Sequence, residues 1–369
     1  MPTQVGRYEL VQLLATGGMA DIYLARQTDL DRRVAVKVLA PHRNADPEAR
    51  VLFDDEARVL SMLSHANLAA VYEVASVGGM QYVAMELVEG VDLRVLVQET
   101  SRLEAPVATA IVRAAAAGLD HAHRRCDPEG RPLHLVHRDV SLSNIMVTYD
   151  GSVKVVDFGI ARSALSVHTT SPGIVRGKAA YMSPEQALGE AVDLRTDVFA
   201  LGIVLYELTT GRRCFAGASD FERMISIVRG EYVSPTAVVP GYAPGLAKII
   251  ATCLAVDANK RYSSAAALVE ALDQLAHAEG WATGTPAIAA LMRATYGELP
   301  TPLPHTAEVT ASSIVDEKPS PCAAPHATVR ITRRRLAKGT CSDTGDDTGD
   351  DDGPTRGRRS VPRMFRSAA

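Results

Sequence analysis

The sequence of 369 residues has few of the features that define a specialised class of protein. Its five cysteines are scattered without a C-x-x-C pair, which argues against a zinc site or a disulfide framework and favours a reducing compartment. No segment approaches the roughly 20 apolar residues that a membrane-spanning helix needs. Residues 1–6 also contain no charged stretch leading into an apolar one, as a signal peptide would. We therefore expect a cytoplasmic protein without a membrane span.

An excess of charge of either sign is also absent. The formal net charge is −4, which is too small to indicate general attraction to nucleic acid or to a membrane surface. We therefore expect no nucleic-acid partner. The length exceeds what one small core needs, and it predicts one large bilobal domain with an appendage.

The pattern of apolar residues changes along the chain. Before residue 92 it consists of short β-like runs, such as residues 34–39 and 82–87, with one helical stretch over residues 46–63. Beyond that point helical periodicity takes over, with Pro106 in the first turn of a long helix that ends near Arg124. The pattern predicts an α+β fold, in which a small β-rich lobe with one main helix precedes a larger, mainly helical lobe.

The composition changes again after Trp281. Thr285 as N-cap, Pro286 at the first helical position and Gly297 after the last turn predict a short appended helix within residues 281–299. Residues 300–369 contain prolines, small polar residues and alternating charge blocks, and they predict a disordered tail. Such blocks are typical of a solvated linker, and docking of a partner is the alternative.

The motifs that indicate chemistry lie in the middle of the chain. His137, Arg138 and Asp139 are followed by Asn144 and then by Asp-Phe-Gly at residues 157–159. Two acids and an amide at this spacing can hold a hydroxyl nucleophile and two magnesium ions around one phosphoryl group. Such a match alone would be weak. It gains weight from its order, because Val-Ala-Val-Lys at 34–37 and Glu56 precede it and Tyr-Met-Ser-Pro-Glu at 181–185 follows it.

On these motifs, residues 7–277 resemble a bacterial protein kinase of the eukaryotic (Hanks) type, of the serine/threonine class. The resemblance implies a kinase domain over residues 8–277, with an N-lobe at about 8–85, a hinge at 86–91 and a C-lobe at 92–277. It also implies ATP as a substrate, Mg²⁺ with Mn²⁺ as the alternative, and protein substrates. Autophosphorylation, with self-association for reaction in trans, is a further expectation.

The resemblance assigns roles to the motif residues. Lys37 would bind the α- and β-phosphates and would be held by Glu56. Asp139 would orient the substrate hydroxyl and accept its proton, while Asn144 and Asp157 would hold magnesium.

The expected nucleotide site has three parts. Glycine-rich loops of this family follow G-x-G-x-x-G, but here Ala15 and Ala20 replace the outer glycines, which should stiffen the turn. The expected loop residues are Leu14, Ala15, Thr16, Gly17 and Gly18. Ile22, Ala35 and Met146 would sandwich the adenine. In the hinge, Met85 would lie behind the ring, Glu86 and Val88 would offer backbone groups, and Asp92 would bond the ribose.

Two further positions depart from the family pattern. Ser141 stands where serine/threonine kinases carry a lysine that stabilises the transferring phosphate, and Lys178 stands where the family usually has a threonine. In the family fold these positions touch, so Lys178 could supply the missing ammonium. The alternative is a surface lysine with no role.

Phosphorylation of the activation segment is a further expectation. Arg138 beside the base implies a basic pocket for a phosphate carried by Thr169, Thr170 or Ser171.

Two other functions remain open beside an active protein kinase. The alanines of the glycine-rich loop, Ser141 and Lys178 fit a pseudokinase, a nucleotide-tolerant module that binds proteins, whereas the retention of Asp139 and Asn144 argues against it. A small-molecule kinase of related fold is disfavoured by the motif at residues 181–185, which is typical of a peptide platform.

Overall fold

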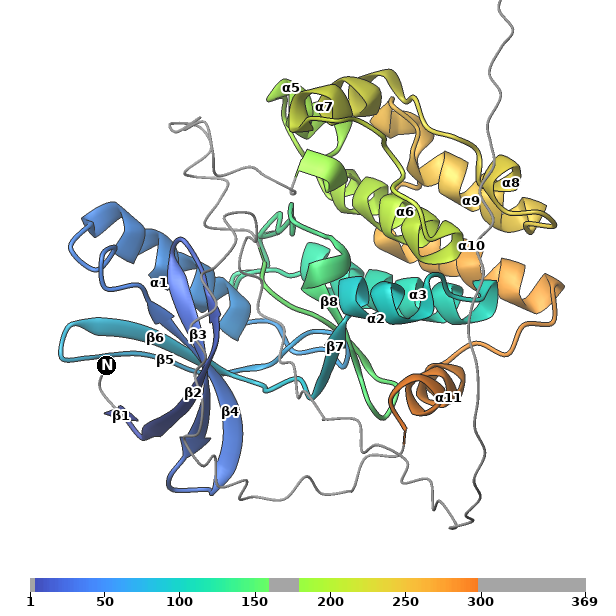
Figure 1. Cartoon of the computed structure of the whole chain (residues 1–369). Coiled ribbons are helices and arrows are strands. Elements are labelled where there is room, and N and C mark those ends of the chain that lie inside the picture. Colours follow the sequence, from blue (N-terminus) through green and yellow to red (C-terminus); the bar gives the residue numbers. More distant parts are fainter. Residues whose placement is uncertain (1–3, 159–178, 298–369) are drawn as a thin grey trace, which may run out of the picture. The chain divides into compact units, whose positions relative to one another are not determined.

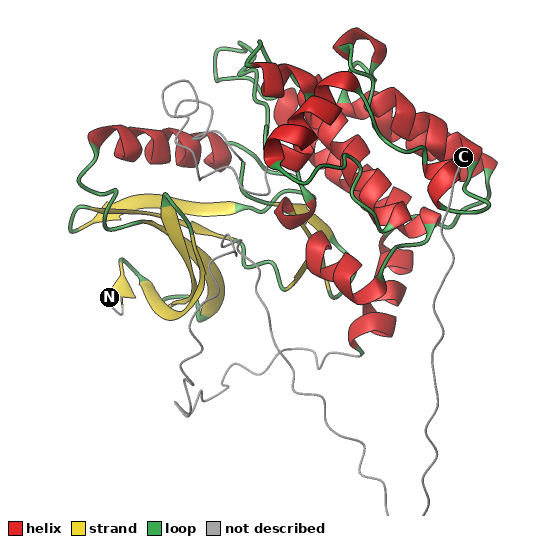
Figure 2. Cartoon of the chain, turned by 45° about the horizontal axis from the view of Figure 1, so that its top comes forward, coloured by secondary structure: helices red, strands yellow, loops and turns green. Residues whose placement is uncertain are grey.

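The computed structural model describes residues 4–158 and 179–297, and every structural statement below concerns these residues. The strands of the first part form a small lobe, and most helices belong to a second, larger lobe (Figures 1 and 2). This arrangement confirms the predicted α+β fold.

The small lobe is a six-stranded antiparallel sheet in the order β1-β2-β3-β4-β6-β5. Its strands are β1 (Gln4–Val5), β2 (Tyr8–Thr16), β3 (Ala20–Gln27), β4 (Arg32–Leu39), β5 (Val71–Val77) and β6 (Met80–Met85). Helix α1 (Pro47–Ser61) contacts β5 and β6. Phe53 and Ala57 of this helix are buried in one cluster with Leu39 and Val83 of the sheet. Burial of this apolar face fixes α1 on the sheet.

The large lobe begins with a small sheet followed by helices. The sheet contains β7 (Gly90–Asp92), β8 (Ile145–Thr148) and β9 (Val153–Val155) in that order. The longer helices are α2 (Leu93–Thr100), α3 (Ala105–His123), α6 (Arg195–Thr210), α7 (Asp220–Arg229), α9 (Pro244–Cys253), α10 (Ala265–Ala278) and α11 (Thr285–Tyr296). The shorter helical segments are η1 (Leu142–Asn144), η2 (Ala179–Tyr181), α5 (Pro184–Leu188), α8 (Pro235–Val238) and η3 (Ala258–Lys260).

Helix α6 lies in the core of the large lobe. Every residue from 196 to 210 is buried, and α3, α8, α9 and α10 contact it. The helix is therefore covered on all sides by its neighbours.

Most helix boundaries predicted from the sequence agree with the structure, and one cap is wrong. Asp46 caps α1 through its side chain, and Pro106 lies in the first turn of α3. The N-cap of α11 is Gly284 rather than Thr285, and its φ of 126° is a conformation that favours glycine. Among the described residues, no helix is long and apolar enough to cross a membrane.

Candidate active site

The ion pair between β4 and α1 is the first element of the site. Lys37 Nζ lies 2.8 Å from Glu56 Oε1, and the two side chains are only 16% and 8% exposed. Lys37 faces the same side of β4 as Ala35, because side chains alternate along a strand. The site therefore has its predicted lysine and glutamate in contact.

Asp157 lies next to this pair, although it comes from the large lobe. Its Oδ1 is 3.8 Å from Lys37 Nζ. Asp157 follows β9 and has a φ of +54°, a left-handed conformation that a non-glycine residue rarely adopts. Phe158 is buried, with its ring centroid 4.5 Å from that of His137. This packing anchors the strained backbone at Asp157.

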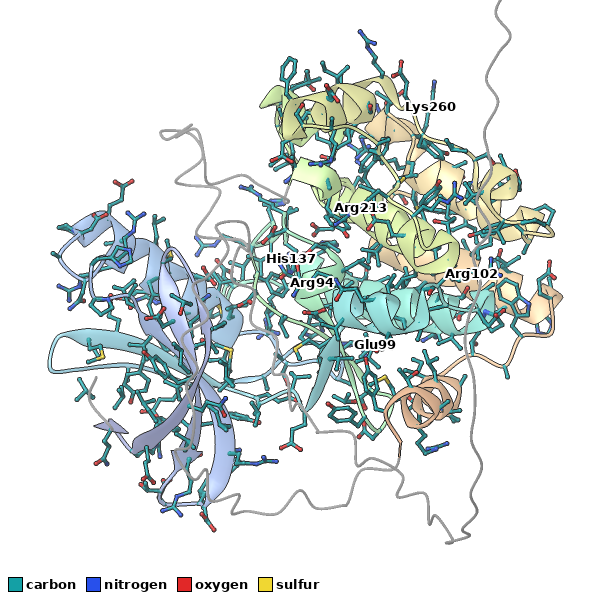
Figure 3. All side chains as sticks on the ribbon, viewed as in Figure 1. Arg94, Glu99, Arg102, His137, Arg213 and Lys260 are labelled. Atoms are coloured by element: carbon teal, nitrogen blue, oxygen red, sulfur yellow. The ribbon has the colours of Figure 1, made fainter. Side chains whose placement is uncertain are left out.

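The loop that carries Asp139 is held by a buried carboxylate. Asp197, at the start of α6, accepts the backbone N–H groups of His137 and Arg138 at 2.8 and 2.9 Å, and His123 Nε2 lies 2.7 Å from it. Burial alone would raise the pKa of Asp197, but the contact with His123 and the backbone donors hold that pKa below its ordinary value. His137 lies between the strands of the small lobe and the helices of the large one (Figure 3).

Asn144 is oriented by Asp139. Its Nδ2 donates to the backbone oxygen of Asp139 at 2.8 Å and to Oδ2 at 3.1 Å. The amide oxygen of Asn144 is therefore the atom left for another ligand. Ser141 is buried in the same loop, and its Oγ lies 3.1 Å from that of Ser143.

Strand register brings together four residues predicted to contact the nucleotide. Ile22 pairs with Lys37 across β3 and β4, and Ala35 pairs with Met85 across β4 and β6.

The predicted glycine-rich loop is the turn between β2 and β3. Gly17 N–H donates to the carbonyl of Ala20 at 3.0 Å, and a Cβ at Gly17 would lie 2.8 Å from that oxygen. Gly17 is therefore the position where the turn needs glycine. Gly18 has open space around it.

Glu86 has a structural role that the sequence did not indicate. Its carboxylate accepts from Lys154 of β9 at 2.8 Å and from the Ala70 N–H at 3.1 Å, and its own N–H donates to Ala70 O at 2.8 Å. The predicted adenine contact of Glu86 therefore rests on its backbone carbonyl.

Asp92 and Met146 face each other in the register of β7 and β8. Asp92 is fully buried, and its Oδ1 accepts the Val95 N–H at 2.8 Å as the N-cap of α2. Its role as a helix cap accounts for the buried carboxylate without any bound ligand. The contact of Asp92 with the ribose therefore stays a prediction.

The motif at residues 181–185 is joined to the catalytic loop. Ser183 and Gln186 form a capping box at the start of α5, and Gln186 Nε2 donates to the Arg138 carbonyl at 3.0 Å. Gln186 is not among the predicted site residues, although Ser-x-x-Gln is a capping-box signal in the sequence.

Glu185 and Arg261 form a bidentate ion pair at 2.7 and 2.8 Å. Burial would raise the pKa of Glu185, but hydrogen bonds from Arg261 and Thr196 hold that pKa at about 2. The pair joins α5 to the segment after η3.

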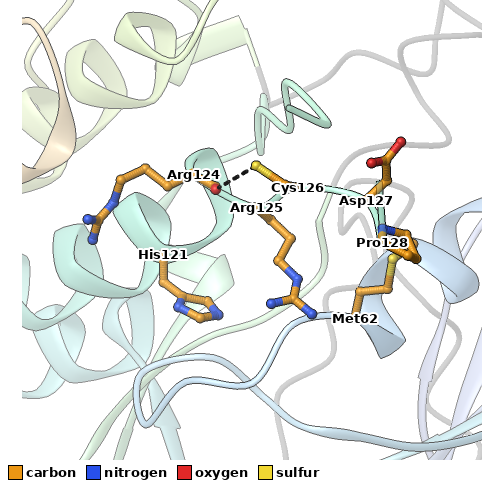
Figure 4. A pocket seen from close by; sticks show the side chains of 7 residues that line it. All are labelled: Met62, His121, Arg124, Arg125, Cys126, Asp127 and Pro128. Atoms are coloured by element: carbon orange, nitrogen blue, oxygen red, sulfur yellow. Dashed lines mark hydrogen bonds between the residues drawn. The ribbon is translucent and has the colours of Figure 1, made fainter. Parts of the chain in front are cut away.

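A cavity of about 630 Å³ lies away from this site, at the end of α3 (Figure 4). It is lined by Met62, His121, Arg124, Arg125, Cys126, Asp127 and Pro128. Cations at a helix C-terminus complement the helix dipole, so its basic side chains have a structural explanation.

Several predicted residues lie outside the described ranges. They are Gly159, Lys178 and the three candidate phosphorylation sites, Thr169, Thr170 and Ser171.

Residues 8–272 match the family model described as "Protein kinase domain". The chain belongs to this family.

Its curated relatives are bacterial kinases. The chain is 35% identical over 338 residues to tyrosine-protein kinase MasK of Myxococcus xanthus, and the match covers 88% of this chain and 52% of MasK. It is 38% identical over 265 residues to serine/threonine-protein kinase PknB of Mycobacterium leprae, covering 70% of this chain and 41% of PknB. The chain thus spans about half the length of these relatives.

Among solved structures, the PknI kinase domain of Mycobacterium tuberculosis is similar, with a TM-score of 0.56 and 26% identity. The match covers 75% of this chain and 99% of that domain.

Proposed function

We propose that the chain is an ATP-dependent protein kinase that transfers the γ-phosphoryl group to serine and threonine hydroxyls, its own included. The observation that carries the proposal is the formed Lys37–Glu56 pair with Asp157 3.8 Å from the same ammonium. The groups that we propose to bind phosphate and metal are therefore neighbours. The Asn144–Asp139 contact adjoins them, because Val156 N–H, next to Asp157, donates to the Asn144 carbonyl at 3.0 Å. The family membership supports the same conclusion.

Each residue of this set has one task in the proposal. Lys37 binds the α- and β-phosphates, and Glu56 holds its ammonium in place. Asp139 orients the substrate hydroxyl and accepts its proton.

Asn144 and Asp157 fit a magnesium site. The amide nitrogen of Asn144 is used by Asp139, which leaves its amide oxygen for a metal ion. The backbone of Asn144 is joined to the residue before Asp157, because Val156 N–H donates to the Asn144 carbonyl at 3.0 Å. Mg²⁺ prefers oxygen ligands such as these. Within the described ranges, no group of three or more His, Cys, Asp or Glu side chains could hold a metal. Nucleotide phosphates and water would therefore complete the coordination. Bound Mg²⁺ would neutralise charge that develops on the phosphates, and Mn²⁺ accepts the same ligands.

ATP would bind between the two lobes. We assign the phosphates to the turn formed by Leu14, Ala15, Thr16, Gly17 and Gly18. We assign the adenine to Ile22, Ala35, Met85 and Met146, with backbone bonds from Glu86 and Val88 and a ribose contact from Asp92. The register of β3, β4 and β6 supports the adenine pocket.

Residues 8–277 form the kinase domain in this proposal, with the hinge at 86–91. Lys178 would supply the ammonium that Ser141 lacks. The proposal further places the kinase in the cytoplasm, with proteins as substrates and self-association for reaction in trans.

The relatives differ in the type of hydroxyl that their names give as the phosphate acceptor. PknB is named a serine/threonine kinase, whereas MasK is named a tyrosine kinase. Hydrolysis of the autophosphorylated chain followed by phosphoamino-acid analysis decides between them. We expect phosphoserine and phosphothreonine, and phosphotyrosine alone would replace the serine/threonine assignment. A pseudokinase would incorporate no phosphate and would yield none of these phosphoamino acids.

A further inference from the structure

Helix α11 lies outside the residues matched by the kinase family model, which ends at residue 272. It nevertheless packs on the large lobe, where it contacts α3 (Figure 1). Ile288, Ala289 and Met292 are 2%, 7% and 1% exposed, and Ile288 and Met292 belong to the main core of that lobe. The helix is therefore part of the folded domain.

The first contact of interest is with the turn between β8 and β9. Gly151 has a φ of +91°, and a Cβ there would lie 2.5 Å from the Thr285 oxygen and 2.6 Å from the Ala289 nitrogen. Both atoms are backbone, so a side chain at residue 151 could fit only if α11 moved. The turn and the helix are thus packed at backbone distance.

The second contact is aromatic. The rings of Tyr149 in the turn and Tyr296 at the end of α11 meet edge to face, with centroids 5.9 Å apart. Burial and the nearby carboxylate of Glu89 raise the pKa of Tyr149. Tyr149 therefore lies between α11 and the residue that precedes β7.

Glu89 connects this turn to the small lobe. Its carbonyl accepts the Tyr149 N–H at 3.3 Å, and Gly90 beside it pairs with Thr148. Its carboxylate forms an ion pair with Arg33 of β4. A continuous series of contacts thus runs from α11 through Tyr149 to Glu89, three residues beyond Glu86.

We propose that Tyr149 and Tyr296 are positioning residues through which α11 fixes the interlobe segment at Glu89 and so sets the affinity for nucleotide. The inference rests on the proposed function only in taking ATP as the ligand of the adjacent pocket. An unanchored segment adopts more conformations, and the binding-competent fraction falls accordingly.

The test compares Tyr296→Ala with Arg293→Ala in the full chain. Arg293 is exposed on the same helix and serves as the matched control. Binding of a fluorescent ATP analogue should weaken roughly three- to tenfold in Tyr296→Ala, as expected for loss of an edge-to-face pair. Arg293→Ala should bind as wild type does. Tyr296→Phe keeps the aromatic ring and should bind the analogue as wild type does.

Steady-state rates provide a second readout. The KM for ATP should rise with the dissociation constant, while kcat changes less than twofold. If Tyr296→Ala does not fold, Tyr296→Leu keeps apolar burial without the aromatic edge and should show the same weakening.

A lower melting temperature with unchanged nucleotide affinity would show that α11 only stabilises the lobe, and would overturn the inference. Binding does not require phosphoryl transfer. A wild-type chain that binds nucleotide but transfers no phosphate would refute the proposed function while leaving this comparison decisive. A wild-type chain that binds no nucleotide would refute both.

Discussion

Glu56→Gln removes the charge that holds Lys37 and keeps the shape of the side chain. In the native pair, Lys37 Nζ and Glu56 Oε1 lie 2.8 Å apart and are largely shielded from water. A hydrogen bond between charged groups contributes about 1.5–3 kcal/mol, against about 1 kcal/mol for a neutral one. The change should therefore lose roughly 0.5–2 kcal/mol of the interaction that positions Lys37.

The loss should appear in catalysis, because Asp157 becomes the carboxylate nearest to Lys37, at 3.8 Å. Lys37 would then shift towards Asp157 and away from the phosphates. We expect kcat/KM for ATP to fall by more than about twofold and up to about thirtyfold, since 1.4 kcal/mol corresponds to tenfold in rate.

The assay is phosphorylation of a general protein substrate at several ATP concentrations. Glu48→Gln is the matched control, because Glu48 is exposed in the first turn of the same helix; its kcat/KM should stay within twofold of wild type. Wild-type kcat/KM in Glu56→Gln would refute the role assigned to this pair.

Three further results are expected. Arg261→Met should lower the free energy of unfolding by about 3–5 kcal/mol in urea titrations, because the buried partner of Glu185 is lost. Arg113→Met is the control, because Arg113 belongs to a more exposed ion pair, and it should cost under about 1 kcal/mol. Equal losses in the two variants would contradict this account. The pKa of Glu185, lowered from 4.5 to about 2, should stabilise the fold by about 3 kcal/mol at neutral pH. That stability is lost as the pH falls from about 4.5 to about 2, and Glu185→Gln should lack this part of the acid dependence. Lys178→Ala should lower kcat roughly ten- to a hundredfold, because the proposed ammonium at the transferring phosphate is lost, and Ser141→Lys should restore kcat. Additive effects in this double-mutant cycle would show that Lys178 has no role in catalysis.

The sequence predicted the parts of the site that lie in short contiguous motifs. Val-Ala-Val-Lys places Lys37 on a strand, and the spacing of Asp139 and Asn144 allows the hydrogen bond between them that the structure contains. Such motifs predict side-chain positions because the residues are close in sequence and the local backbone fixes their relative geometry.

Contacts between distant segments were not predictable in the same way. Periodicity shows which face of an element is buried but not which element covers it. The pairing of Glu86 with Lys154, and the packing of α11 against Gly151, depend on the tertiary arrangement. The N-cap of α11 was misplaced by one residue because glycine at 284 supplies a backbone conformation that threonine disfavours.

Incorporation of labelled phosphate from ATP tests the central claim most directly. Purified wild-type chain and Asp139→Asn are incubated with magnesium and γ-labelled ATP. The wild type should become labelled, and Asp139→Asn should not, because it lacks the group that accepts the hydroxyl proton while the fold held by Asp197 remains. Equal labelling of the two proteins, or no labelling of the wild type, would contradict the account.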